Sequence, residues 1–138
     1  MDPVTKSYVS LGLVVLALFE FWAAMRVFGT TGKPGPRARL IIRLHRIGGY
    51  VFLAYFIWIS WVCLDLMDRL GAAGKGPDAR AAIHGSLAIA LFLLLLLKLS
   101  FVRLYRKFRP YAPLLGIILA VGTLTLWGIA GLMFLILI

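Results

Sequence analysis

The sequence predicts an all-α integral membrane protein, an up-down bundle of four transmembrane helices that occupies residues 1–138 as one domain. Three features support this prediction. First, 62% of the residues are hydrophobic and the mean hydropathy is +0.98, whereas a soluble domain is ~45–50% apolar. Second, four apolar runs each have the ~20 residues needed to cross a bilayer. Third, the connections are short, which favours antiparallel neighbours.

The first two helices are expected at about residues 7–28 and 38–67. The first run is long enough to span a bilayer, so we expect a retained helix and not a cleaved signal peptide. Glycines and prolines in residues 29–36 end it. The second run exceeds one crossing, so its arginine-rich first turns are expected among the headgroups, where they can meet anionic lipid. The crossing itself is then about 47–67.

The last two helices are expected at about residues 79–106 and 111–138. Asp78 is a suitable N-cap for the third helix, because its carboxylate can accept a hydrogen bond from the first turn. In the fourth, Gly116 and Ala120 stand four residues apart, a spacing of small residues that lets helices approach closely in lipid. We expect this face to pack within the bundle or against another subunit.

The net charge of +10 reports membrane topology and gives no indication of a nucleic-acid partner. The face reached after the first helix collects ten basic residues and no acidic one, and the opposite face has four of each. Because positive residues gather on the cytoplasmic side, both termini are expected outside, in a multi-pass protein of a bacterial or archaeal plasma (inner) membrane. The ten basic residues are Arg26, Lys33, Arg37, Arg39, Arg43, Arg46, Arg103, Arg106, Lys107 and Arg109.

Three ionisable residues interrupt the apolar spans, and such residues are costly in lipid. At about 1.5 Å per residue, Glu20 and Lys98 fall at a similar depth in the cytoplasmic half, so we predict a buried ion pair between them. The alternatives are that Lys98 extends alone to the headgroups, or that the two handle protons or substrate. Asp65 lies near the outer end of its helix, level with Arg80, and we predict an interfacial ion pair there.

The two histidines, His45 and His84, are candidate axial ligands of haem iron. Imidazole suits iron and is a common axial ligand of haem. Each lies near a membrane face with arginines nearby, which suits the haem propionates, and glycines follow each, which leaves room for a flat macrocycle. The alternative is a hydrogen-bonded packing histidine. The candidate propionate partners are Arg43, Arg46, Arg103 and Arg106 for His45, and Arg80 for His84.

Two short motifs resemble a known family. The run Leu44-His45-Arg46-Ile47-Gly48-Gly49-Tyr50 resembles the opening of a haem-bearing helix in the cytochrome b561 and ferric-reductase-like transmembrane families. The run Arg80-Ala81-Ala82-Ile83-His84-Gly85-Ser86 resembles the start of their partner helix. The resemblance covers about residues 40–106. It implies haem b held between histidines of two helices, one haem near each face, with electrons crossing the membrane.

The chain departs from that pattern because its histidines fall at different depths. The level of His84 on the second helix is near residue 63, ~18 residues or about 27 Å from His45, so the two are expected to serve separate sites. The positions opposite them, 61–63 for His84 and 98–102 for His45, contain no histidine. The second ligand is then the Cys63 thiolate, a methionine (Met25 near His45, Met133 near His84) or a group from another subunit. The remaining possibility is that no haem binds.

Two functions therefore stay open. The first is a b-type cytochrome-like protein or redox subunit that passes electrons between a quinone or cytoplasmic donor and an outer partner. The second is a haem-free membrane anchor or accessory subunit of a larger complex, and a transporter or channel is a third class. The expected partners are the lipid bilayer and other membrane or redox subunits, or further copies in a homo-oligomer. The single cysteine, Cys63, excludes an intramolecular disulfide and covalent c-type haem.

Overall fold

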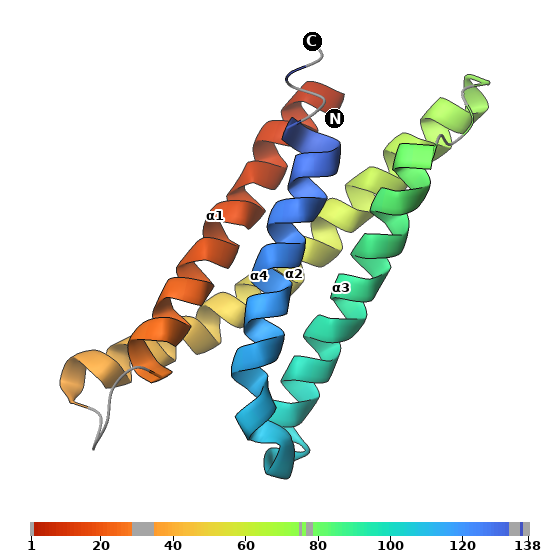
Figure 1. Ribbon diagram of the computed structural model, residues 1–138. Helices are drawn as coiled ribbons and strands as arrows, with labels where there is room; N and C mark the ends of the chain where they lie inside the picture. Colours follow the sequence, from red (N-terminus) through yellow and green to blue (C-terminus); the bar gives the residue numbers. More distant parts are fainter. Residues whose placement is uncertain (1, 29–34, 75, 77–78, 133–135, 137–138) are drawn as a thin grey trace.

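A computed structural model describes residues 2–28, 35–74, 76, 79–132 and 136, and confirms the all-α, four-helix prediction. The long helices lie alongside one another in a bundle (Figure 1). The elements are α1 (Pro3–Phe28), α2 (Pro36–Ala72), α3 (Ala79–Arg103), the 3-10 helix η1 (Arg106–Tyr111), α4 (Ala112–Trp127) and the π-helical η2 (Gly128–Leu132).

Three of the helices are long and apolar enough to cross a membrane: Val4–Arg26 within α1, then Pro36–Ala72 and Ala79–Arg103. α4 is shorter, with 16 residues, and η2 continues it. Large apolar side chains remain exposed along these helices, among them Trp61 at 74% and Ile89 at 65%. A water-soluble protein rarely leaves such extended apolar surface uncovered, so the chain is a membrane protein whose outer surface contacts lipid.

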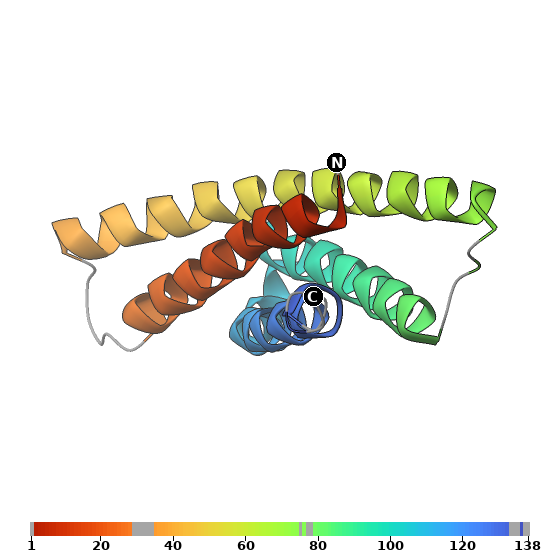
Figure 2. The same cartoon turned by 90° about the horizontal axis from the view of Figure 1, so that it is seen from above.

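The helices form a bundle in which α2 flanks one side (Figure 2). α1 packs against α2 and α4, and α4 packs against α3 as well, while α2 and α3 have little direct contact. The start of α1 lies beside η2, which is compatible with the up-down arrangement. The Trp127 indole N–H donates to the Ser7 carbonyl at 3.2 Å and thereby joins the last helical segment to the first.

The core lies in the middle of the bundle and takes side chains from all four helices. Phe56 of α2 stacks on Phe92 of α3 with ring centroids 6.1 Å apart. Gly122, a small residue outside the predicted Gly116–Ala120 pair, permits close approach of α4 to α3, because a Cβ there would clash with the Leu91 side chain. The buried cluster consists of Leu13, Ala17, Phe52, Phe56, Ile59, Leu91, Leu95, Leu119 and Leu126.

Each helix differs from its predicted bounds at one or both ends. α1 begins at Pro3 and not at residue 7, and α2 runs over Pro36–Ala72 and not over 38–67. The third helix ends at Arg103, because the Ser100 carbonyl accepts hydrogen bonds from both the Leu104 and Tyr105 N–H groups (2.8 Å each) and the chain turns into η1. The fourth predicted helix, 111–138, is regular only to Trp127 and then passes into η2. Met133 and the expected cap Asp78 lie outside the described residues.

Candidate functional site

Two cavities lie in the bundle, and each contains one of the two histidines. The His45 cavity has a volume of about 450 Å³ and takes side chains from all four helices, including Glu20, His45, Lys98 and Gly116. The His84 cavity, of about 430 Å³, is lined by His84, Trp61, Cys63 and Lys6, among others. Both volumes fall in the range of ligand pockets, ~300–1,000 Å³. The prediction that the histidines belong to separate sites agrees with this arrangement.

Some of the residues that helix depth places opposite each histidine line the same cavity as that histidine. Lys98, Leu99 and Val102 of α3 line the His45 cavity, together with Met25 of α1. Trp61 and Cys63 line the His84 cavity. The agreement follows from the constant rise per residue of neighbouring antiparallel helices.

Glu20 and His45 form the ion pair of the His45 cavity. The His45 Nδ1 atom lies 2.7 Å from Glu20 Oε2, and the side chains are 27% and 13% exposed. The contact meets the distance of an ion pair but not the angle of a hydrogen bond, and both His45 Nδ1 and the other carboxylate oxygen, Glu20 Oε1, are buried without a hydrogen-bond partner. A carboxylate this close to one imidazole nitrogen can accept its N–H after a small rotation and so fix the orientation of the ring.

Gly48 makes this contact possible. A Cβ at position 48 would lie 1.8 Å from Glu20 Oε1 and 2.9 Å from Glu20 Cδ, so only glycine leaves room for the carboxylate. The sequence suggested that the glycines after His45 leave room for a macrocycle. That expectation is corrected for Gly48, where the space is filled by Glu20. Gly85, after His84, has no heavy atom within 4 Å of the position of a Cβ.

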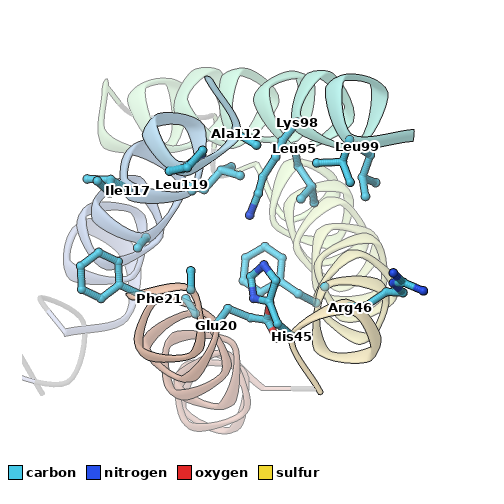
Figure 3. Close-up of a pocket in the computed structure, with 18 of the residues that line it drawn as sticks. Glu20, Phe21, His45, Arg46, Leu95, Lys98, Leu99, Ala112, Ile117 and Leu119 are labelled. Atoms are coloured by element: carbon cyan, nitrogen blue, oxygen red, sulfur yellow. The ribbon is translucent and has the colours of Figure 1, made fainter. Parts of the chain in front are cut away.

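The predicted Glu20–Lys98 ion pair needs a correction. The two side chains do share one cavity, but the carboxylate pairs with His45. Lys98 reaches into the cavity from α3, on the wall opposite His45 (Figure 3). Its Nζ atom lies against α4, 3.3 Å from the position that a Cβ on Gly116 would take. The predicted Asp65–Arg80 pair is also corrected: Asp65 pairs with Arg69, one turn along the same helix, and both are exposed.

The predicted arginine partners separate into three groups. Arg46 and Arg103 line the His45 cavity, although the Arg46 guanidinium points away from its centre (Figure 3). Arg103 lies over the Tyr50 ring, 5.5 Å from the ring centroid. Arg43 and Arg80 are exposed and line neither cavity. The side chain of Arg106 lies outside the described residues.

Nδ1 of His84 is buried without a hydrogen-bond partner, as Nδ1 of His45 is. The two environments differ in polarity, because the His84 cavity is lined mainly by apolar side chains such as Phe56, Ile59 and Phe92. A buried polar atom without a partner costs ~1–3 kcal/mol. In the described part of the chain, no group of three or more His, Cys, Asp or Glu side chains could hold a bare metal ion.

Residues 3–137 match the model of DUF6529, a family of unknown function. The chain belongs to this family. The match covers all four helices and both cavities, so the features described above lie within the family's own domain. No curated protein and no solved structure matches the chain.

Proposed function

We propose that this chain is a membrane-embedded, b-type cytochrome-like electron-transfer protein that binds haem b through His45, with His84 offering a second, separate site. When bound, the haem would supply one-electron redox chemistry. The observation that supports this proposal best is the geometry of the His45 cavity, where a carboxylate holds one nitrogen of an imidazole that extends into a ligand-sized space.

The donor set of the His45 cavity fits an axial ligand. A metal-binding histidine almost always gives its second nitrogen to a carboxylate or carbonyl, which fixes the tautomer and raises the basicity of the ligating nitrogen. Glu20 stands in that position, 2.7 Å from Nδ1, and leaves Nε2 for iron. Glu20 is therefore a positioning residue for His45. At the mouth, Arg103 and Tyr50 offer a cation and a hydroxyl to the propionates.

The His84 cavity has an imidazole nitrogen that could bind iron, but its described lining residues include no carboxylate beside the ring. The buried, unpartnered imidazole nitrogen of His84 would gain a partner by binding iron. No carboxylate lies among the described residues that line this cavity, so the His84 ring has no acidic neighbour comparable to Glu20 there. We therefore assign the stronger binding to the His45 cavity.

In this proposal, electrons cross the membrane by passing from one cavity of the bundle to the other. The two cavities lie toward opposite ends of the core, and the aromatic and aliphatic side chains between them, such as Phe52 and Phe56, exclude water. A quinone or a cytoplasmic donor would deliver electrons at one end, and a redox subunit would receive them at the other. The residues of this chain orient the ligands and keep the surroundings dry.

The second candidate function is a haem-free anchor or accessory subunit. The observation that favours it is that Glu20 fills the space beside Gly48, so the wall after His45 is already packed. In that case, the Glu20–His45 pair is a structural tie between α1 and α2, and the exposed apolar faces contact partner subunits.

A reduced-minus-oxidised absorption spectrum of the purified chain tests the choice. The proposed function predicts a sharp α band that weakens in His45→Ala and in His84→Ala and disappears in the double variant. Asp65→Asn serves as the control, because Asp65 is exposed and lines neither cavity. A flat spectrum from folded wild-type protein, purified from cells supplied with haem, would favour the anchor.

A further inference from the structure

We infer that Lys98 is the second axial ligand in the His45 cavity, so that iron there is bound by one imidazole and one primary amine. This inference rests on the proposed function and deepens it, since it names the group opposite His45. It is carried by the position of Lys98, by its surroundings and by the chemistry of its side chain.

Lys98 and His45 lie on opposite walls of one cavity. His45 belongs to α2 and Lys98 to α3, two helices whose backbones come close at few points, and both side chains line the cavity. Figure 3 shows the Lys98 side chain extended into the space with its terminal nitrogen toward the His45 ring. Two ligands of one haem iron must approach at the same depth from opposite sides. Two α3 residues with side-chain nitrogens, Lys98 and Arg103, line the cavity, and only the lysine amine can lose a proton to offer a lone pair.

The surroundings leave the Lys98 nitrogen available. The one carboxylate that lines the cavity, Glu20, is paired with His45, and no ion pair joins Lys98 to an acidic side chain in the parts of the chain that the structure describes. Gly116 of α4 lies directly beside Nζ and gives it room to move. Lysine within a membrane span is costly by ~2.5–3.5 kcal/mol and usually marks a functional site.

The chemistry of a primary amine suits this role. In its neutral form, lysine has a nitrogen lone pair, and metal ligands must be deprotonated to bind. Arginine has no such lone pair at any ordinary pH, because its guanidinium stays protonated. Replacement of Lys98 by arginine therefore keeps a long nitrogen-bearing side chain at this position and removes its ability to bind iron.

The test uses the full chain with His84→Ala, so that only the His45 cavity is observed, and measures the spin state of the ferric protein by electron paramagnetic resonance and absorption. Bound haem is quantified separately as the pyridine complex. The expected result is a six-coordinate, low-spin signal. When Lys98→Arg is added, this low-spin signal should be replaced by a high-spin signal, while the haem content stays the same. When Lys98→His is added in its place, the signal should be low-spin with shifted g values.

Two results would overturn the inference and leave the proposed function intact: a high-spin signal before Lys98 is changed, or a low-spin signal that Lys98→Arg does not alter. Absence of haem from the folded wild-type chain would instead refute the proposed function, and the inference with it. If the His84→Ala chain misfolds, the same comparison is made in the wild-type chain. Part of the low-spin signal must then convert to high-spin in Lys98→Arg and must remain low-spin in Lys98→His.

Discussion

The close approach of Glu20 to Gly48 makes a sharp prediction about one substitution, Gly48→Ala. The added methyl group would lie 1.8 Å from Glu20 Oε1, so the carboxylate must swing away and give up its 2.7 Å contact with His45. The obstacle is the end of a flexible side chain, so the helix backbone need not move. The expected result is loss of the ion pair between α1 and α2 without unfolding of the bundle.

Two opposing effects set the change in the free energy of unfolding in Gly48→Ala. Adding a methyl group to a packed site costs ~1–3 kcal/mol, and replacing glycine by alanine within a helix gains about 0.5–1 kcal/mol. The free energy of unfolding should therefore fall by up to about 2.5 kcal/mol in Gly48→Ala. In a Glu20→Ala background the obstacle is gone, and the same substitution should raise the stability by about 0.5–1 kcal/mol.

The assay is unfolding in detergent micelles by SDS titration, followed by far-UV circular dichroism, for the four members of this double-mutant cycle. Gly85→Ala is the matched control, because it also lies within a helix and a Cβ there meets no heavy atom within 4 Å. Gly85→Ala should leave the free energy of unfolding unchanged or raise it, both in the wild-type chain and in the Glu20→Ala chain. The reasoning fails if Gly48→Ala resembles Gly85→Ala, or if its cost persists when Glu20 is alanine.

Three further predictions concern the packing between helices, with unfolding in micelles as the measurement. Gly122→Ala should cost ~1–3 kcal/mol, because its Cβ would lie 2.3 Å from Leu91, a buried side chain that cannot move aside; a neutral result would contradict the α3–α4 contact. Trp127→Phe should cost ~0.5–1.5 kcal/mol by removing the hydrogen bond to the Ser7 carbonyl, and an unchanged midpoint would argue against that bond. Asp65→Asn should cost less than about 1 kcal/mol, since its ion pair is exposed, and a larger loss would show that the pair is more than a surface contact.

The sequence predicts the helices and their depths well, because both depend on local properties. Apolar run lengths locate four helices, and a constant rise per residue places Lys98 opposite His45 and Cys63 opposite His84. The sequence does not predict which of the side chains at one depth contact each other. The sequence gives no information on how α1 is rotated about its axis, so it cannot decide whether Glu20 meets Lys98 or His45.

The direction of long side chains is the second feature that run lengths leave undetermined. Arg46 stands beside His45 in the sequence, but successive residues of a helix point about 100° apart, and its guanidinium is directed away from the cavity. Tyr50, which the sequence did not single out as a site residue, lines the cavity together with Arg103. Tyr50 lies one turn after Arg46 on α2, and this spacing could have indicated that both residues line the same cavity.

The central claim is that His45 holds a haem in the cavity it shares with Glu20 and Lys98. Native mass spectrometry of the purified chain, released from detergent, tests this claim most directly. For the His84→Ala protein, we predict a species heavier than the polypeptide by the mass of one haem, and its disappearance when His45→Ala is added. A folded wild-type chain from haem-supplied cells that carries only the mass of its polypeptide would contradict the account.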